Sequence, residues 1–374
     1  MRTLTATVLL AISAMLGAAQ AQAQAVAPDA AAPAESASWQ QCAALSGDAS
    51  ARLACFDRWA AQQRSVTPTI TQTVPVTLTM TVPLSHDCKN ERFTELSRFW
   101  ELEAGSDCGT FGIRGYRPIS LSWIGSDSVN KQPSSPSLDH TASSALAYST
   151  SETRIQLSVR TKIAQGLLTH EQSLKRDSLW FAYSQQSYWQ LFNGDLSRPF
   201  RSTDHEPEFT YIYPTDMSLP LGWRWRYSGL SVVHQSNGQA LPLSRSWNRT
   251  VLMAGLEKGS QFRLQGKLWR RVQEDPSDDD NPGISDYIGN AEVAAFWDVN
   301  RDNTLGLTLR HSLKVDARGS LRLEWLRKLG ERGLPGGQSE LRFHTQLFSG
   351  YGDSLVDYNR HRTVLSIGLS LVDW

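Results

Sequence analysis

The sequence predicts an all-β protein: a twelve-stranded antiparallel transmembrane β-barrel with a small N-terminal periplasmic extension. Three observations support this. About twelve segments alternate apolar and polar residues with the two-residue period of a strand. These segments run for about 9–14 residues, longer than an ordinary strand and long enough to cross a bilayer at a tilt. Long loops and short turns alternate between them, as in bacterial barrels.

The composition narrows the classes of function. The chain has 374 residues and a formal net charge of zero at pH 7, whereas nucleic-acid-binding proteins usually carry a basic surplus. The mean hydropathy of −0.37 excludes a bundle of membrane helices, each of which needs about 20 mostly apolar residues. It does not exclude a barrel, and 13 Trp, 10 Tyr and 12 Phe are many aromatic residues for so polar a chain.

Residues 1–23 are predicted to be a secretory signal peptide. Arg2 supplies a positive charge, residues 8–17 form a short apolar core, and two overlapping small-x-small cleavage sites cover residues 19–23. A transmembrane anchor is the weaker alternative, because the apolar core is too short to span a membrane. The mature protein is therefore expected to leave the cytoplasm.

Three segments are expected between the signal peptide and the barrel. Residues 24–37, rich in Ala, Pro and Ser, are expected to form a disordered linker. Residues 38–66 are expected to form a small helical hairpin stapled by a disulfide. Residues 67–108 are expected to be a linker and N-terminal extension, with a short helix at 96–103.

All four cysteines lie in these early segments. An even number of cysteines in an exported chain predicts two disulfides. Sequential pairing, Cys42 with Cys55 and Cys88 with Cys108, is the simplest of the three possible arrangements. A zinc site has less support, because the spacing includes no CxxC and no cluster of histidines.

Residues 109–374 are expected to form the barrel. Alternation is clearest over residues 155–163, 262–268, 305–310, 321–325 and 365–371. A soluble β-sandwich would alternate as well, so the length of the strands and the pattern of their connections decide for a barrel. The predicted strands are approximately 110–125, 152–164, 178–191, 206–214, 221–236, 246–257, 260–273, 285–299, 303–313, 318–328, 338–349 and 360–372.

The connections predict which end of the barrel faces outward. Short turns lie at 257–260 and 300–303, whereas most of the alternate links are longer loops rich in Gly, Ser, Asp, Asn and Pro. The link at 330–338 is an exception, because it is long where a short turn is expected. With the N-terminus in the periplasm, the long loops lie outside the cell.

The candidate chemistry lies in HQSNG, which begins at His234, and SRSWNR, which begins at Ser244. His234 and Ser236 are two residues apart on a predicted strand, so their side chains point to the same face. An imidazole there can take the proton of the serine hydroxyl. Asn248, on the paired antiparallel strand, is placed to accept a hydrogen bond from the other ring nitrogen and fix the tautomer.

A His-x-Ser pair alone occurs by chance in many strands, but the longer pattern is more specific. HQSNG, five residues and then SRSWNR resembles outer-membrane phospholipase A, a family of barrel enzymes of Gram-negative bacteria. The resemblance runs from about residue 112 to residue 374. It includes the segments 188–191, 199–201, 206–207, 279–282, 349–355 and 357–359.

The resemblance implies a role for each matched residue. His234 is the general base, Ser236 the nucleophile and Asn248 the residue that orients the histidine. The Gly238 amide, together with a calcium-bound water, holds the oxyanion. These roles imply hydrolysis of the acyl esters of phospholipids and lysophospholipids through an acyl-serine intermediate, at the external rim of the bacterial outer membrane.

The resemblance also implies a calcium ion and a homodimer. The calcium ligands would be the Ser244 hydroxyl, the Gln239 carbonyl and the carbonyl of Ser197 of the partner subunit, and oxygen ligands suit calcium. Asp280 matches a weaker calcium position used by the monomer. Gln185 matches a polar residue at the dimer contact. Activity would therefore depend on dimerisation.

Two positions depart from the family pattern. The family often has Arg where this chain has Gln239, which matters little if only the backbone carbonyl binds calcium. It has Asp where this chain has Leu241, so a nearby carboxylate is missing and calcium affinity is expected to be lower. The acidic run 278–280 is an alternative calcium cluster, although such runs are more often solvated. The remaining histidines have no partner in register and are expected to be surface or loop groups.

The alternation within one predicted strand contains a conflict. Arg224 and Arg226 alternate with Trp223 and Trp225, which puts the arginines in the lumen, and the same parity would put His234 and Ser236 there too. The family faces this pair to the lipid. A bulge near residues 228–229 would reconcile the two, because an extra residue reverses the alternation.

A second class of function remains open from the sequence. A porin-like or structural barrel that has lost catalysis would share the fold and the polar lumen. The intact His234, Ser236 and Asn248 favour the enzyme.

Overall fold

The computed structural model of the chain describes residues 39–45, 47–64, 88, 90, 92–169, 175–315, 318–330 and 341–371. These residues fall into two compact units, one within Met1–Met80 and one within Thr81–Trp374. The predicted signal peptide, the linker at 24–37 and residues 67–87 of the predicted extension lie outside the described residues. Within the described ranges, no helix is long and apolar enough to cross a membrane.

The first unit contains α2 (Trp39–Ala43) and α3 (Ala49–Arg64). Alanines favour a helix over the α3 segment. Asp48 caps its start, because its Oδ1 accepts hydrogen bonds from the Ser50 and Ala51 amides at 2.9 and 3.1 Å. The Cys42–Cys55 disulfide joins the two helices, and Cys88 pairs with Cys108 in the second unit. The four cysteines are therefore paired in sequential order, as predicted.

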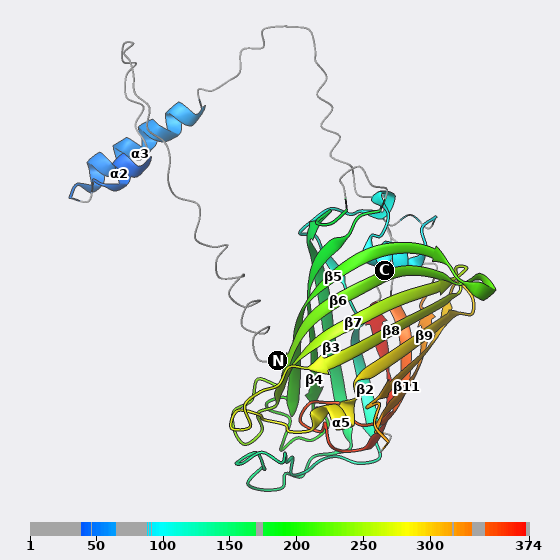
Figure 1. Cartoon of the computed structure of the whole chain (residues 1–374). Coiled ribbons are helices and arrows are strands. Elements are labelled where there is room, and N and C mark those ends of the chain that lie inside the picture. Colours follow the sequence, from blue (N-terminus) through cyan, green and yellow to red (C-terminus); the bar gives the residue numbers. More distant parts are fainter. Residues whose placement is uncertain are drawn as a thin grey trace. The chain divides into compact units, whose positions relative to one another are not determined.

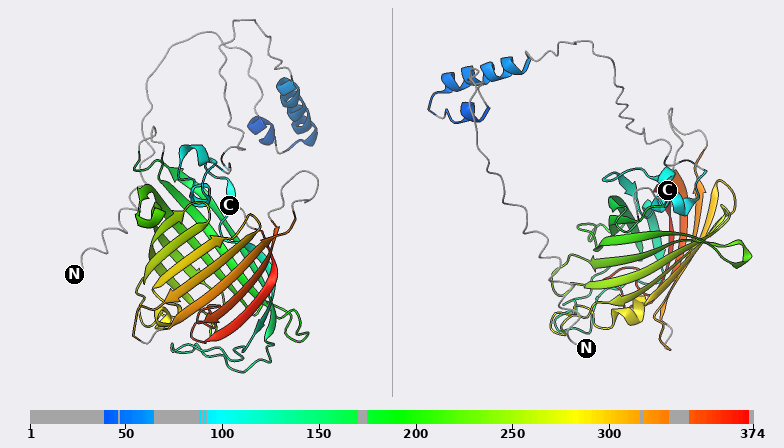
Figure 2. Two further views of the ribbon diagram at one scale, coloured as in Figure 1. Left: turned by 90° about the vertical axis from the view of Figure 1, so that its right-hand side faces the viewer. Right: turned by 45° about the horizontal axis from the view of Figure 1, so that its top comes forward.

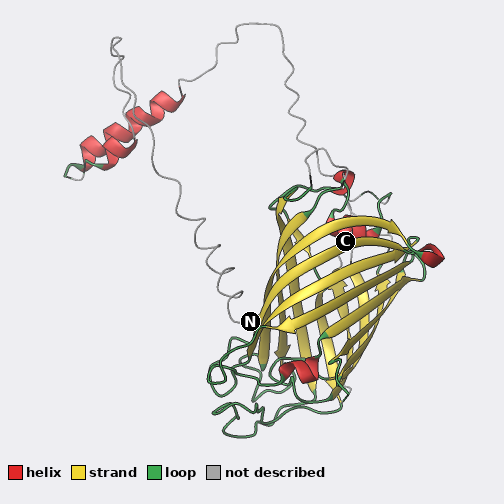
Figure 3. Ribbon diagram, viewed as in Figure 1, coloured by secondary structure: helices red, strands yellow, loops and turns green. Residues whose placement is uncertain are grey.

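The second unit is a closed antiparallel barrel of twelve long strands (Figures 1 and 3). Each strand pairs with its neighbours in sequence, and the ring closes where β2 pairs with β13 on one side and β3 on the other. The twelve-stranded barrel predicted from the sequence is confirmed. Its strands are β2 (Ile119–Ser126), β3 (Ser151–Gln165), β4 (Ser178–Trp189), β5 (Ser202–Ser218), β6 (Arg224–Ser236), β7 (Ser246–Lys258), β8 (Phe262–Arg271), β9 (Ala291–Asp298), β10 (Asn303–His311), β11 (Gly319–Lys328), β12 (Leu341–Gly350) and β13 (Arg362–Leu371).

Two strands differ from their predicted bounds. The first predicted strand is divided into β1 (Ile113–Gly115), which pairs with β3, and β2. Pro118 lies in the interruption and has no N–H to donate to a ladder. The strand predicted at 285–299 begins only at Ala291, because α5 (Ile284–Ile288) takes its first residues.

The two faces of the barrel wall differ in polarity, and Figure 2 shows the tilted strands from two further sides. On the outer face of β10, Leu305 and Leu309 are 41% and 48% exposed. On the lumen face of β3, Arg154, Arg160 and Lys162 are buried. Each strand thus has an apolar outer face and a charged lumen face. The two faces together give the negative mean hydropathy of the whole sequence.

One end of the barrel carries the long loops, and a buried ion network ties them together. Arg201, in the β4–β5 loop, contacts Glu152 at 2.6 Å and Asp357, in the β12–β13 loop, at 2.9 Å. Arg362 also reaches Asp357, at 3.2 Å. The loops at this end are 127–150, 190–201, 237–245, 272–290 and 351–361, with the shorter link 312–318. We call this end the loop rim.

A short helix lies inside the barrel near the opposite end. This helix, α4 (Glu95–Trp100), places the Trp100 ring 5.8 Å from the rings of both Trp180 and Tyr227, on the lumen side of β4 and β6. The Cys88–Cys108 disulfide joins the two ends of the segment that contains α4. The sequence predicts a short helix here but treats residues 67–108 as an extension, whereas α4 is part of the barrel core.

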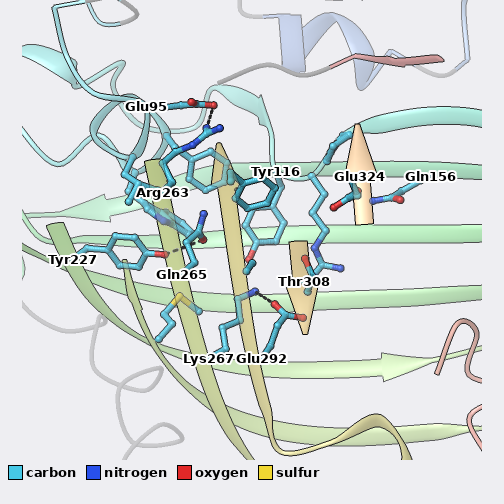
Figure 4. Close-up of a pocket in the computed structure, with 18 residues that line it drawn as sticks. Glu95, Tyr116, Gln156, Tyr227, Arg263, Gln265, Lys267, Glu292, Thr308 and Glu324 are labelled. Carbon is cyan, nitrogen blue, oxygen red and sulfur yellow. Dashed lines mark hydrogen bonds and ion pairs between the residues drawn. The ribbon is translucent and has the colours of Figure 1, made fainter. Parts of the chain in front are cut away.

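Buried ion pairs hold this helix, which we call the lumen helix. Arg226 of β6 contacts both Glu103 and Glu257, and Glu257 accepts a hydrogen bond from the Leu96 amide at 2.8 Å. Arg263 of β8 contacts Glu95. Between the lumen helix and the wall formed by β6–β11, a cavity of about 180 Å³ remains (Figure 4). Its lining includes charged groups of both signs, among them Lys267, Glu292 and Glu324.

Candidate active site

A bulge in β6 sets the direction in which the candidate residues point. Trp225 pairs with Leu256 and Tyr227 with Gly255, so Arg226 is an extra residue in the ladder. Arg226 and Tyr227 are both buried, although they are adjacent. The bulge expected near residues 228–229 is therefore present, two residues earlier, and it reverses the alternation of the strand.

Beyond the bulge, the outer face of β6 is the face of His234. Leu230, Val232 and His234 are exposed, whereas Ser231 and Val233 between them are buried. Ser236 is half-buried and lies one step farther along this outer face. The pair therefore lies outside the lumen, next to apolar side chains that suit a lipid.

His234 and Asn248 lie directly opposite each other in the β6–β7 ladder. The Nδ1 atom of His234 lies 2.9 Å from the Asn248 Oδ1. An amide oxygen can only accept, so the bond requires a proton on Nδ1. In the neutral ring this leaves Nε2 as a proton acceptor, facing the outer surface that it shares with Ser236.

Sequence reasoning missed Glu274, which orients Asn248. The Asn248 Nδ2 donates a hydrogen bond to Glu274 Oε1 at 3.1 Å, so the amide oxygen is the atom turned toward His234. Arg271 in turn contacts Glu274 at 2.9 Å and Asp279 at 2.6 Å. No spacing in the sequence links Glu274 to Asn248, because the loop between β8 and β9 brings them together.

The loop after β6 presents the amide of Gly238. Asn237 is buried and organises this loop: its Oδ1 accepts from the Arg245 amide at 3.0 Å and its Nδ2 donates to the Leu243 carbonyl at 2.7 Å. Gly238 has a φ of +61°, which glycine adopts easily. No described residue accepts a hydrogen bond from the Gly238 N–H, so this donor is available to a ligand.

Ser244 and Asp280 are brought together at the loop rim. The Ser244 hydroxyl donates to Asp280 Oδ2 at 2.7 Å, and Ser246 donates to the same oxygen at 3.1 Å. His140, in the β2–β3 loop, lies 3.0 Å from Asp280 Oδ1. Burial raises the pKa of the Asp280 carboxyl, but the hydrogen bonds from Ser244, His140 and Ser246 together outweigh burial and hold this pKa below its usual value.

The acidic run 278–280 does not form one cluster. Asp280 turns to Ser244, whereas Asp279 contacts Arg271 and Asp278 is exposed. Among the described residues, no group of three or more His, Cys, Asp or Glu side chains could hold a metal. A cation at this rim would therefore need hydroxyl, amide or backbone oxygens as ligands in addition to the Asp280 carboxylate.

Gln239 supplies such an oxygen. Its Nε2 donates to the Arg201 carbonyl at 3.1 Å, which fixes the orientation of the amide. Its Oε1 is buried and has no hydrogen-bond partner in the described part of the chain. Leu241, where the resemblance implies Asp in the family, is 59% exposed.

Gln185 and Ser197 come from β4 and the loop that follows it, whereas Ser236 is at the end of β6, two strands away. Ser197 is in the β4–β5 loop, and its carbonyl accepts a hydrogen bond from Trp189 Nε1 at 2.8 Å. Gln185 is on the outer face of β4, where its Nε2 donates to Ser187 at 3.2 Å. Within the described ranges, no hydrogen bond joins either residue to Ser236, Ser244 or Asp280.

The other histidines are expected to have no partner in register, but three of them contact a side chain on another strand or loop. His140 contacts Asp280, and His344, buried in the lumen, lies 3.2 Å from Glu324. His205, on β5, lies 2.7 Å from the Tyr183 hydroxyl. Each partner is on another strand or loop, so spacing along one segment does not reveal it.

The fold is that of an outer-membrane β-barrel, and its outer wall carries a histidine, an asparagine and a serine, the groups that an acyl hydrolase uses. Comparison with known proteins agrees with this class. The family model described as Phospholipase A1 matches residues 96–371. The putative phospholipase A1 of Neisseria meningitidis serogroup B is 34% identical in an alignment of length 362 that covers 89% of this chain and 90% of that protein.

Two solved structures have the same architecture. Outer membrane phospholipase A from Escherichia coli superimposes with a TM-score of 0.60 at 29% identity, covering 70% of this chain and 99% of that one. The outer membrane phospholipase dimer of Salmonella typhi, solved with bound calcium, gives a TM-score of 0.58 at 26% identity, covering 70% and 93%. The chain belongs to the phospholipase A1 family, the outer membrane phospholipases A.

Proposed function

We propose that this chain hydrolyses the acyl ester bonds of phospholipids and lysophospholipids through an acyl-serine intermediate. The observation that carries the proposal is the hydrogen bond between His234 and Asn248 on the outer wall, two residues from Ser236 on the same face. A base that is already oriented beside a serine can activate it as a nucleophile. The exposed leucine and valine side chains below this group suit the acyl chains of a lipid.

The reaction follows from these positions. His234 Nε2 takes the hydroxyl proton of Ser236, whose Oγ attacks the ester carbonyl and forms a tetrahedral intermediate. The Gly238 N–H donates to the oxyanion, a contribution that strengthens as charge develops. His234 then gives the proton to the leaving alcohol oxygen, and the acyl group remains on Ser236. A water, deprotonated by His234, releases the fatty acid and restores the serine.

The residues at the loop rim fit a calcium ion. The Ser244 hydroxyl, the Gln239 carbonyl and the Asp280 carboxylate offer hard oxygen atoms, and the buried, unpartnered Gln239 Oε1 adds another. A bound calcium would supply positive charge beside the developing oxyanion. Ser244 donates its hydroxyl hydrogen to Asp280, which leaves the lone pairs of its oxygen available to a cation.

Dimerisation is proposed to complete this calcium site. Ser197 would supply its carbonyl to the site of the other subunit, and its bond from Trp189 leaves the second lone pair of that oxygen available. Gln185, on the outer wall, would lie at the contact between subunits. We place the loop rim outside the cell, so that Ser236 would face phospholipid in the outer leaflet.

The first test is the release of fatty acid from phospholipid micelles. Wild type with calcium is expected to be active, and EDTA is expected to abolish that activity. Ser236→Ala is expected to lower kcat by about 10⁴-fold or more, because the nucleophile is lost. The control is Ser260→Ala, in the β7–β8 turn at the opposite end of the barrel, which should match wild type. Full activity in Ser236→Ala would exclude the mechanism.

A second test concerns the orientation of Asn248. Glu274→Ala is expected to lower kcat about fivefold without changing KM, because one hydrogen bond that orients Asn248 is worth about 1 kcal/mol. The matched control is Asp275→Ala, the neighbouring exposed carboxylate, which bonds only to Ser277 in its own turn. Equal kcat values for the two variants, measured on the same micelles, would contradict this role of Glu274.

The alternative is a porin-like or structural barrel without catalysis. The lumen argues against a pore, because the lumen helix and several buried ion pairs occupy it. If folded, dimeric wild type with calcium releases no fatty acid, the alternative is favoured.

A further inference from the structure

A second histidine lies beside the proposed nucleophile. His205 of β5 is the register partner of Ser236 on β6, and Gln185 of β4 is the register partner of His205. Gln185, His205 and Ser236 therefore form one row across three strands of the outer wall. Residues that face each other in such a row have Cβ atoms about 5 Å apart, so the imidazole lies next to the serine.

The ring of His205 extends toward the proposed oxyanion donor. A Cβ atom built on Gly238 would lie 3.6 Å from both Cδ2 and Nε2 of His205. The Nε2 edge of the ring thus borders the space in front of Gly238. A side chain at position 238 would fill part of this space, which suggests that glycine is needed here for room as well as for its positive φ.

The opposite edge of the ring is fixed by Tyr183. The Tyr183 hydroxyl donates its proton to Gln185 Oε1 at 3.1 Å and lies 2.7 Å from His205 Nδ1, so Nδ1 is the donor in the bond between the two rings. A second proton, at Nε2, would make the ring an imidazolium whose Nε2–H points toward the Gly238 side, and a neighbouring anionic oxygen would favour that form.

The Nε2 of His205 has no hydrogen-bond partner among the described residues. The surrounding outer wall is apolar, since Phe209, Leu230 and Val232 are 48%, 47% and 54% exposed. A polar nitrogen on a lipid-facing surface is costly unless a ligand satisfies it. The atom beside both Ser236 and Gly238 that lacks a partner is therefore a candidate for substrate contact.

We propose that His205 is a substrate-binding residue whose imidazolium donates a hydrogen bond from Nε2 to an anionic oxygen of the bound phospholipid. This inference rests on the proposed function and adds a donor to it. The oxygen is either the oxyanion that forms at the ester carbon or an oxygen of the phosphodiester. Tyr183 is a positioning residue that holds the ring in this orientation.

The test compares His205→Phe and His205→Gln on two substrates: lysophosphatidylcholine, which has a phosphodiester, and a monoacylglycerol, which does not. His205→Phe is expected to lose about 10- to 100-fold in kcat/KM, the range for a hydrogen bond to a charged group. A loss in kcat on both substrates assigns the donor to the oxyanion. A loss confined to lysophosphatidylcholine and expressed in KM assigns it to the phosphodiester. His205→Gln, which keeps an N–H donor, should recover most of the loss.

The controls separate binding from structure and assembly. His311→Phe replaces a histidine at the loop-rim end of β10, on the outer face, and should match wild type. Tyr183→Phe should show a smaller loss than His205→Phe. Dimer content is measured for every variant in the same micelles. The proposal is overturned if His205→Phe stays within twofold of wild type on both substrates, or if chemical cross-linking into dimers restores its full activity.

Binding without catalysis keeps this inference distinct from the proposed function. A non-hydrolysable diether phosphatidylcholine is titrated against Ser236→Ala and against Ser236→Ala with His205→Phe. Tenfold weaker binding by the double variant supports the phosphodiester contact even if wild type shows no hydrolysis. Equal binding by the two variants would exclude the contact between His205 and the phosphodiester. The oxyanion would then be the only proposed partner of His205, and the kcat comparison tests it.

Discussion

His234→Ala is expected to lower kcat for phospholipid hydrolysis by about 10⁴-fold or more, with little change in the folded barrel. The side chain is exposed on the outer wall, so its removal leaves no buried cavity. The loss arises because the variant lacks the proposed base. His234 is the imidazole that Asn248 orients, through the 2.9 Å contact between Nδ1 and the Asn248 Oδ1. Asn248→Ala should cost less than His234→Ala and more than Glu274→Ala, since it removes the orientation of the base and not the base itself.

His311→Ala is the matched control for His234→Ala, because it removes an exposed histidine from the same face of another strand. Fatty-acid release and the heat-dependent gel mobility of the folded barrel are measured for both. A kcat within tenfold of wild type for His234→Ala would show that another group is the base. The neighbouring His205 would then be the first residue to examine.

Arg226→Met is expected to lower the free energy of unfolding by about 3–5 kcal/mol, the usual cost of leaving a buried ion pair without one partner. Arg226 is 2% exposed and contacts Glu103 of the lumen-helix segment and Glu257 of β7. Without the guanidinium, two carboxylates face each other in the lumen. The stability is measured by urea titration of the barrel in lipid vesicles.

Arg224→Met provides the comparison on the same strand. Arg224 also forms an ion pair, with Asp216, but its side chain is 46% exposed, and such surface pairs contribute about 0–1 kcal/mol. Limited proteolysis near residues 92–108 should become faster in Arg226→Met and not in Arg224→Met. Equal unfolding free energies for the two variants would mean that the lumen helix does not depend on Arg226.

The barrel was accessible to sequence reasoning because its wall repeats one simple pattern. Every strand buries one face and exposes the other, so the period of two is visible wherever Leu or Ile alternates with a polar residue. Positions where the alternation of apolar and polar residues is interrupted are harder to predict. The bulge at Arg226 could be inferred only from the conflict between the two ends of β6, and its position was two residues off because either site resolves the conflict.

The contacts between segments could not be predicted. His234 and Asn248 are recognisable because they lie in a specific motif on adjacent strands. Glu274, His140 and His205 come from other loops or strands, and their partners are set by how the loop rim and the sheet fold together. A short helix is predicted at 96–103, but its place in the lumen is not, because six residues, ELSRFW, are too few to show which face packs against the wall.

The lumen helix has a consequence for the permeability of the membrane. A twelve-stranded barrel with an empty interior would let small solutes leak through, and each added copy would weaken the barrier that the membrane provides. Here the interior holds a helix anchored by Arg226 and Arg263, and the Arg201–Asp357 network lies beneath the loop rim. We therefore expect that a cell can carry many copies of this protein, with the proposed chemistry on the outer wall, without gaining a wide aqueous pore from each copy.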